Sequence, residues 1–178
     1  PVATSAYTST APFSVDEDET DVVKRTVAIP FSDVDSDETT ATIHAAVSTG
    51  ITAVTTACTD GLCFATFTLT PNFNYTQYGL ASFTYYVEID GENSNTETVY
   101  IKATQVDDSP VPTPATLGIV EDTPKKIVLS YYDADDDDGT SCEIISGSYT
   151  PTNFTFSSTP CSCDNAGECS ALLTPYEN

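Results

Sequence analysis

The sequence has few basic residues, and this shortage excludes one class of partner. Five Lys and Arg residues stand against 27 Asp and Glu residues, and the formal net charge is −22 over 178 residues. Nucleic-acid binding depends on basic side chains that neutralise phosphates, so no nucleic-acid partner is expected. A charge of this sign favours cations as ligands.

Long apolar runs and helical periodicity are also missing. No segment approaches the ~18 consecutive apolar residues of a membrane span, so no membrane span is predicted in this segment. The β-formers Thr, Val, Ile, Tyr and Phe fill the stretches between Pro and Gly, which predicts an all-β fold. Neither an initiator Met nor a signal peptide stands at the start, so we expect a mature or internal N-terminus.

Catalytic motifs are scarce. His44 is the only His, it lies in the strand-like segment ATIHAAV, and no Ser or Cys nucleophile is placed around it by motif. We interpret His44 as a structural residue. The clustered aspartates lack the aromatic-lined cleft signature of a glycosidase, which favours a metal or solvent role for them. The sequence therefore predicts a protein that is not an enzyme.

Six Cys residues occur without a neighbouring His and without a CxxC pair, which favours three disulfides over a zinc site. Disulfides persist in oxidising compartments, so we expect a protein that is secreted or displayed at a cell surface. One pair flanks Thr-Asp-Gly-Leu, a hairpin-tip sequence, and a second pair matches it; the third follows by elimination, with the roles of Cys161 and Cys163 open to exchange. The predicted pairs are Cys58–Cys63, Cys163–Cys169 and Cys142–Cys161.

Two parts of the chain repeat each other. Pro1-Val2 reappears as Pro110-Val111, 109 positions later, and a unit of this length suits one β-sandwich. We therefore predict two domains, residues 1–109 and 110–178, of which the second lacks counterparts of Tyr75 to Val106. The other correspondences are FSDVDSDE (31–38) with YYDADDDD (131–138), CTDGLC (58–63) with CSCDNAGEC (161–169), and Thr70-Pro71 with Thr174-Pro175.

The clearest strand signal is the alternation of apolar and polar residues from Ala81 to Ile89. Turn residues follow at 90–93, and a second alternating run at 96–106 completes a predicted hairpin. Shorter strands are expected at 22–30, 41–47, 51–57 and 62–69.

Four motifs accompany these strands: E-D-T-P at 121–124, an acidic D-x-D loop, TPNFN followed by SFTYYV within 70–87, and a V-x-D-x-P linker at 106–110. Together they resemble the tandem Ig-like, cadherin-like repeats (tandem-95 type) of secreted and surface adhesins. The resemblance implies that each domain is a cadherin-like β-sandwich, and that calcium binds at the junction between domains.

A D-x-D loop places two carboxylates on one side of an extended segment, where they chelate a cation together. By the resemblance, linker aspartates and an acidic residue near the start of the next domain complete the shell, and bound Ca²⁺ stiffens the linker. The competing interpretation is that these aspartates are solvated loop residues on an acidic surface. The calcium candidates are Asp107, Asp108, Glu121, Asp133 and Asp135 at the junction, with Asp33 and Asp35 in the first domain.

Two N-glycosylation sequons occur, Asn74-Tyr75-Thr76 and Asn153-Phe154-Thr155, both beside turn residues where the acceptor is expected to be exposed. Asn178 corresponds to Asn74 in the repeat and is a third candidate. The Thr-rich start and the PVPTPAT segment are candidates for O-linked glycans. The competing interpretation is that N-x-T arises by chance in a Thr-rich chain.

These observations predict an extracellular structural repeat of a glycosylated rod or self-assembling filament, built by head-to-tail self-association. The strands that the second domain lacks are expected either from continuation of the same polypeptide, which is the simpler case, or from a neighbouring molecule. The alternative is an adhesin module whose loops and tyrosines bind a carbohydrate or a receptor protein.

Overall fold

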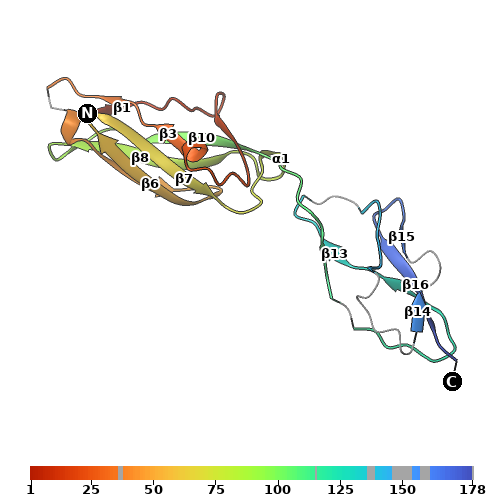
Figure 1. Cartoon of the computed structure of the whole chain (residues 1–178). Helices are drawn as coiled ribbons and strands as arrows, with labels where there is room; N and C mark the ends of the chain where they lie inside the picture. Colours follow the sequence, from red (N-terminus) through yellow and green to blue (C-terminus); the bar gives the residue numbers. More distant parts are fainter. Residues whose placement is uncertain (36–37, 115, 136–138, 146–153, 157–160, 178) are drawn as a thin grey trace. The chain divides into compact units, whose positions relative to one another are not determined.

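The computed structural model describes the chain except for residues 36–37, 115, 136–138, 146–153, 157–160 and 178. It divides into two compact units, Pro1–Val106 and Asp107–Asn178, whose elements are labelled in Figure 1. Nearly all regular structure is β-strand, and the described helical segments are the single turns η1 (Val23–Arg25), η2 (Glu38–Thr40) and α1 (Tyr75–Tyr78). The predicted all-β fold is confirmed.

Unit 1 contains two main sheets. The first has the strand order β2-β10-β8-β5, with β9 attached to β8, and the second has the order β3-β7-β6. The β2–β10 pair is parallel, and the other pairs are antiparallel. The strands are β1 (Val2–Ala3), β2 (Phe13–Asp16), β3 (Thr26–Ala28), β4 (Phe31–Ser32), β5 (Thr42–Val47), β6 (Ile51–Thr59), β7 (Leu62–Leu69), β8 (Ala81–Ile89), β9 (Glu92–Asn93) and β10 (Glu97–Thr104).

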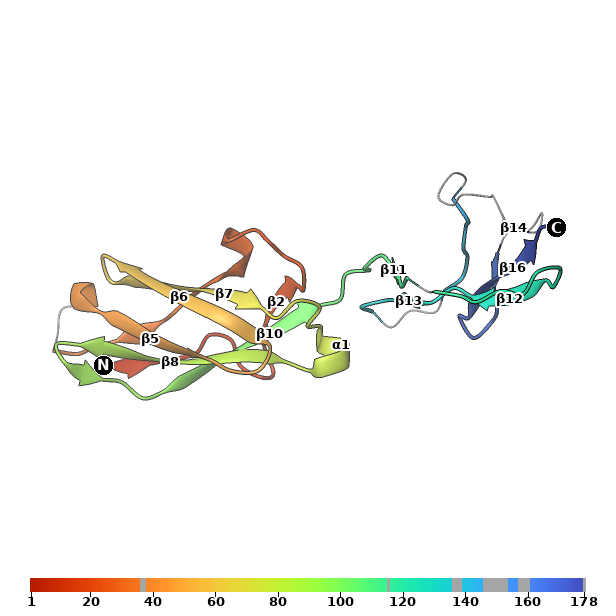
Figure 2. The ribbon, with the colours of Figure 1, turned by 90° about the horizontal axis from the view of Figure 1, so that it is seen from below.

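The core of unit 1 lies between these two sheets, and Figure 2 shows β6 and β7 in one layer with β5 and β8 in the other. Every second residue of β8 from Phe83 to Ile89 is fully buried, as the alternation predicts. Phe67 of β7 packs against Phe83 across the core, with 6.5 Å between the ring centroids. Two sheets with apolar inner faces around one core form a β-sandwich.

The β6–β7 hairpin carries a disulfide at its tip. Cys58 and Cys63 face each other in the strand register, with their Cα atoms 4.1 Å apart. The two tip residues, Asp60 and Gly61, have φ angles of 52° and 77°. Both angles are left-handed, as a two-residue type I′ turn requires, and Asp-Gly is a preferred sequence for that turn.

Unit 2 has the strands β11 (Val111–Pro112), β12 (Lys125–Val128), β13 (Tyr131–Tyr132), β14 (Phe154–Phe156), β15 (Ser162–Cys163) and β16 (Cys169–Pro175). They form a sheet of order β12-β16-β14 with β15 beside β16, and a separate β11–β13 pair. Among the described residues of this unit, the buried apolar ones are Ile127, Ala171, Leu173 and Pro175, together with Cys169.

Unit 2 repeats part of unit 1 in the same register. Val2 pairs with Ser32 in β1–β4, and Val111 pairs with Tyr132 in β11–β13. In the larger sheets Val27 pairs with Ala65, and Ile127 pairs with Ala171. A backbone hydrogen bond next to each of these ladders is repeated as well. Ile29 N–H donates to Cys63 O at 2.9 Å in unit 1, and Leu129 N–H donates to Cys169 O at 2.8 Å in unit 2.

This register corrects one predicted correspondence. Because Ala65 and Ala171 are counterparts in the repeat, Leu69 and Pro175 are counterparts as well. Matching Thr70-Pro71 with Thr174-Pro175 is therefore wrong by two positions. Strand pairing sets the register of a sheet, and a shared dipeptide does not. The described part of unit 2 contains counterparts of β1, β3, β4, β6 and β7, with β14 and β15 in the place of β6, and no strand that corresponds to β8, β9 or β10.

The division between the units falls at 106/107, three residues before the predicted boundary at 109/110. Val106 N–H donates to Glu17 Oε1 of unit 1 at 2.9 Å. Asp108 N–H instead donates to Asp135 Oδ2 of unit 2 at 2.6 Å. Hydrogen bonding therefore assigns Val106 to unit 1 and Asp108 to unit 2.

Candidate functional site

The acidic loop of unit 2 brings together three of the predicted calcium ligands. Asp135 N–H donates to Asp133 Oδ1 at 3.0 Å, and Asp108 N–H donates to Asp135 Oδ2 at 2.6 Å. All three aspartates are half-buried. The loop after β13 and the segment before β11 are therefore joined through aspartate side chains.

The other two candidates of this group are placed differently. Asp107 precedes Asp108 in the chain and its side chain is exposed. Glu121 is exposed in the segment before β12, where its backbone carbonyl accepts a 3.3 Å hydrogen bond from the Thr123 hydroxyl. The contacts that join Asp108, Asp133 and Asp135 do not include these two residues.

The chemistry of this loop suits Ca²⁺, because carboxylate oxygens are its preferred ligands. In this structure, however, the carboxylates of Asp133 and Asp135 each accept a hydrogen bond from a backbone N–H group. Among the residues that the structure describes, the one group of three candidate ligand atoms within 4.8 Å of one another is formed by the sulfurs of Cys142, Cys163 and Cys169. The oxygen ligands of the acidic loop therefore suit Ca²⁺ chemically, but the carboxylates of Asp108, Asp133 and Asp135 do not converge on one point.

The acidic loop of unit 1 has the same local hydrogen bond. Asp35 N–H donates to Asp33 Oδ1 at 3.3 Å, as Asp135 N–H does to Asp133. An aspartate that accepts the N–H two residues ahead forms an Asx turn. The turn alone therefore accounts for aspartate at the first position of both D-x-D loops, whether or not a cation binds.

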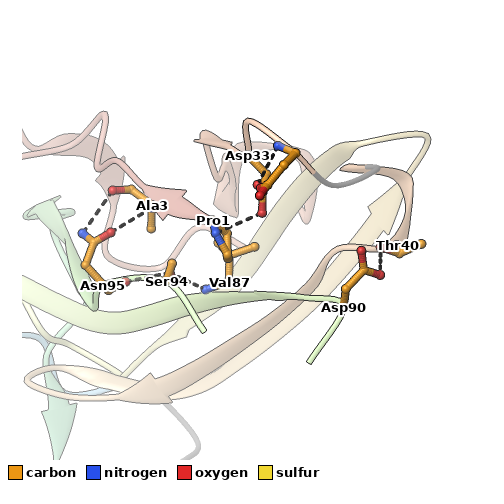
Figure 3. Close-up of polar contacts among 9 residues, drawn as sticks. Pro1, Ala3, Asp33, Thr40, Val87, Asp90, Ser94 and Asn95 are labelled. Carbon is orange, nitrogen blue, oxygen red and sulfur yellow. Dashed lines mark hydrogen bonds and ion pairs between the residues drawn. The ribbon is translucent and has the colours of Figure 1, made fainter. Parts of the chain in front are cut away.

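Unit 1 differs in the partner of this loop. The amino group of Pro1 lies 2.9 Å from Asp33 Oδ2, as Figure 3 shows. Its hydrogen bond to the carboxylate is the main cause that lowers the pKa of Asp33 to about 2, and the N–H of Asp35 adds to the effect. In this structure the Asp33 carboxylate thus contacts the first residue, whereas Asp35 is exposed.

The structure joins the cysteines in the three pairs named from the sequence. Cys163 and Cys169 face each other in β15–β16, as Cys58 and Cys63 do in unit 1. The remaining disulfide links Cys142 to Cys161, with Cα atoms 5.9 Å apart. The exchange of Cys161 and Cys163 that the sequence left open is resolved in this structure by the β15–β16 register.

The predicted sequons have different settings. Asn74 is 2% exposed, and its Oδ1 accepts the N–H of Gln77 at 2.9 Å, which caps the N-terminus of α1. The expectation that this acceptor is exposed is wrong, because the side chain turns inward to satisfy a helical N–H. Asn153 and Asn178 lie outside the described residues. Thr155 of the Asn153 sequon is exposed in β14.

His44 occupies a pairing position on the β5–β8 ladder opposite Tyr86. The two rings stack with 4.7 Å between centroids, and Nε2 lies 2.8 Å from Glu88 Oε2. The His44 and Glu88 side chains are each 40% exposed. These contacts are those of a cross-strand cluster on the outer face of a sheet.

Exposed tyrosines lie at α1 and on β13. Tyr75 and Tyr78 are exposed at α1, where Lys102 Nζ lies 5.0 Å from the centroid of the Tyr75 ring and Tyr78 stacks on Phe73. Tyr132 of β13 is also exposed, while Tyr86, Tyr100 and Tyr131 are half-buried. The rings at α1 offer flat apolar surface beside a cation.

Unit 2 also contains an apolar cavity of about 310 Å³. This volume is at the small end of the range of ligand pockets. The residues that line it include Pro112, Leu129, Tyr131, Cys142, Ile144 and Cys169.

The sequence matches no protein-family model, and no curated protein matches it. Among the described residues, none of the helices is long and apolar enough to cross a membrane.

Proposed function

We propose that the chain is an extracellular structural repeat of a glycosylated rod or self-assembling filament. The observation that carries the proposal is the repeated register of the two units. The β1–β4 and β11–β13 pairs, the β3–β7 and β12–β16 pairs, and the disulfide hairpins all recur in the same order. Repetition of one structural unit is the way that extended proteins gain length.

The cysteines support the extracellular part of this proposal. All six are in disulfides, and two of these disulfides close hairpin tips. Such bonds form and persist in oxidising compartments, and they restrict unfolding of exposed domains. The net charge of −22 keeps an exposed polymer soluble.

Glycosylation and calcium are secondary parts of the proposal. Asn153 is the N-glycan acceptor that we favour, since Asn74 is buried as a helix cap. Asp108, Asp133 and Asp135 are the residues that would hold a Ca²⁺ ion in unit 2, where its charge would offset the repulsion among three carboxylates.

Self-association without a ligand is the property that tests the main proposal. The purified 178-residue chain is examined over a wide concentration range by sedimentation velocity and by electron microscopy. We expect regular, concentration-dependent assemblies. A chain that stays monomeric under all these conditions would contradict the filament.

The second candidate function is an adhesin module for a carbohydrate. The cluster of Tyr75, Tyr78 and Lys102 favours it, because exposed tyrosine rings stack on sugar rings. A glycan array distinguishes the two functions. Binding that is lost in Tyr75→Ala and Tyr78→Ala, and kept in Tyr132→Ala, would favour the adhesin.

A further inference from the structure

We propose that the outer face of the β3-β7-β6 sheet in unit 1 is a docking surface for a second copy of this chain. The inference deepens the proposed function and rests on it, because it names a surface through which repeats associate. The occupant is the same face of the other copy, with its strands antiparallel to those of the first.

The strand registers define this surface, which we call the neutral face. Val27, Ala65 and Phe67 are buried in the core, so their neighbours along β3 and β7 point outward. The β6–β7 ladder adds the residues of β6 that pair with them. None of these side chains carries a charge. The neutral face consists of Thr26, Ala28, Ala53, Thr55, Ala57, Thr59, Leu62, Phe64, Thr66 and Thr68.

A sheet face without charge departs from the composition of this chain, in which 27 acidic residues stand against five Lys and Arg residues. The outer face of the other main sheet follows that composition, with Asp16 of β2, Lys102 of β10 and Glu88 of β8 on it. Like-charged copies repel each other wherever carboxylates meet. A basic partner would gain most from the acidic surfaces, so the neutral face suits a partner of the same charge, which is a second copy.

Threonine hydroxyls of the neutral face are already hydrogen-bonded within unit 1. The Thr26 hydroxyl donates to Val22 O at 2.7 Å, and its oxygen lies 2.8 Å from Thr66 Oγ1. The Thr68 hydroxyl accepts a 3.2 Å hydrogen bond from Arg25. Removing water from a polar group is costly only where that group is left without a hydrogen bond. These threonines therefore present methyl groups that a partner can cover at low cost.

The hairpin end of the neutral face carries its large apolar side chains. Leu62 is 65% exposed and Phe64 is 43% exposed. Both line a cavity of about 430 Å³, whose other lining residues include Ala28, Phe31 and Gly61. Removing such side chains from water is favourable in proportion to the apolar area that is buried. A side chain of the second copy that entered this cavity would bury both residues.

The charges at the two ends of the neutral face determine the orientation of the copies. Asp60 is exposed at the tip of the β6–β7 hairpin. Arg25 lies at the opposite end, where it donates to Thr68 Oγ1 and Phe67 O. A two-fold contact with parallel strands would bring the two Asp60 side chains together. With antiparallel strands each Asp60 approaches the Arg25 of the other copy, so opposite charges meet at both ends.

The size of the neutral face predicts a weak contact. Three strands about 4.8 Å apart, followed from Leu62 to Thr68 at about 3.3 Å per residue, cover roughly 300 Å². A stable interface of standard size buries about 800 Å² of each partner. We therefore expect a dissociation constant of about 0.1–1 mM for one pair. The contact gains strength where several repeats are joined in one filament.

The test is sedimentation equilibrium of the complete 178-residue chain in chelator and about 0.15 M salt. The chelator removes contacts in which a divalent cation bridges carboxylates. Ala57→Glu places a charge on the neutral face, and Ala46→Glu places the same charge on the outer face of β5. Both alanines are exposed on edge strands, which makes the variants a matched pair. We expect Ala46→Glu to pair like the parent chain, and Ala57→Glu to pair at least tenfold more weakly, because it buries a charge.

A second matched pair tests the orientation. Asp60-Gly61 and Asp90-Gly91 are both hairpin tips with left-handed φ angles, and both aspartates are exposed. Asp60→Lys and Asp90→Lys therefore change the net charge equally at equivalent turns. We expect Asp60→Lys to pair at least threefold more weakly than Asp90→Lys, because it places a second cation beside Arg25. Equal dissociation constants would refute the antiparallel orientation.

Folding of every variant is checked by far-ultraviolet circular dichroism and by the mass of the disulfide-bonded chain. Thr55→Glu, at an exposed position of the neutral face, replaces Ala57→Glu if that variant does not fold. Mass spectrometry of the native material tests a different occupant. Sugar attached to Thr55 or Thr59 would identify a glycan as the cover of this face and would overturn the inference.

Each outcome of the sedimentation experiment decides the inference. Equal pairing of Ala57→Glu and Ala46→Glu, or a parent chain that stays monomeric at about 1 mM, would overturn it. Filaments that form equally in both variants would leave the proposed function standing and refute only the neutral face. Association that stops at a dimer and is lost in Ala57→Glu would keep the neutral face and contradict the filament.

Discussion

Glu17 accepts a 2.9 Å hydrogen bond from the backbone N–H of Val106, 89 positions further along the chain. Its own N–H donates to Thr104 O at 3.0 Å, just beyond the parallel pairing of β2 with β10. Glu17 is 4% exposed, and these contacts tie the first part of unit 1 to its last residues. The side chain therefore closes the sandwich at its C-terminal end.

Replacing Glu17 by Ala is expected to destabilise unit 1. The substitution removes the acceptor of the Val106 N–H, and the loss of such a bond costs about 1–3 kcal/mol. Glu17→Gln keeps an acceptor oxygen and should cost less. Urea denaturation measures the free energy of unfolding. Glu19→Ala is the control, because the Glu19 carboxylate pairs with Lys24 and accepts the Asp21 N–H, and these contacts do not involve Val106. Equal effects of the Glu17 and Glu19 variants would contradict this role.

Tyr85 is expected to make unit 1 unstable in alkali. Burial, with a smaller contribution from Glu97, raises its pKa to about 12. The folded state holds the phenol proton more tightly than the unfolded state, so stability is complete below pH 10 and is lost as pH rises to 12. A shift of two units corresponds to about 3 kcal/mol.

The check is the free energy of unfolding between pH 8.5 and 12. Tyr85→Phe should be less stable at pH 8.5, because it loses the hydrogen bond to Thr4 O, and should show a shallower pH dependence. Tyr78→Phe, at an exposed position, should behave like the parent chain. An unchanged slope in Tyr85→Phe would show that another group titrates.

Gly50 is expected to tolerate no side chain. Its φ is +68°, and a Cβ atom would lie 2.6 Å from the Phe73 ring. Gly50→Ala combines left-handed strain, about 1–2 kcal/mol, with displacement of a buried ring. Gly91→Ala is the matched variant, since Gly91 has a φ of +83° and open space around it. Thermal unfolding should show a larger loss for Gly50→Ala, and similar losses would exclude the steric contribution.

Each disulfide is expected to stabilise the folded state more, the longer the loop that it closes. Cys58 and Cys63 are separated by 5 positions, and Cys142 and Cys161 by 19. The chain-entropy estimate is about 2 kcal/mol for the shorter loop and about 3 kcal/mol for the longer. Double Cys→Ser variants of each pair, compared by urea denaturation, test this order. A larger loss for the hairpin disulfide would show that the native contacts of the tip dominate.

Calcium is expected to stabilise unit 2 if Asp108, Asp133 and Asp135 bind it. A ligand present at 100 times its Kd stabilises the folded state by about 2.7 kcal/mol. Calorimetry in excess Ca²⁺ and in chelator measures the shift in Tm. Asp135→Asn keeps an oxygen that accepts the Asp108 N–H but removes the charge, and should reduce the shift; Asp60→Asn at an exposed hairpin tip should not. An unchanged Tm in the parent chain would leave the Asx turns as the reason for these aspartates.

The sequence by itself determined the features that depend on neighbouring residues. The alternation from Phe83 to Ile89 predicted which face of β8 is buried, because side chains of a strand point to opposite faces. Asp60-Gly61 between two cysteines predicted the disulfide hairpin, because the turn type follows from residues that accept left-handed angles. The D-x-D spacing likewise placed Asp33 and Asp133 at corresponding loops.

Tertiary structure decided the features that depend on residues far apart in the chain. The contact of Asp108 with Asp135 and the register that makes Pro175 the counterpart of Leu69 have no local signal. The N-cap role of Asn74 has one in Gln77, three residues later, but the burial of the Asn74 side chain does not. The cavity of unit 2 has none either, since its lining residues come from segments far apart in the chain. Local patterns specify which residues seek burial, and only the packing of distant strands specifies what buries them.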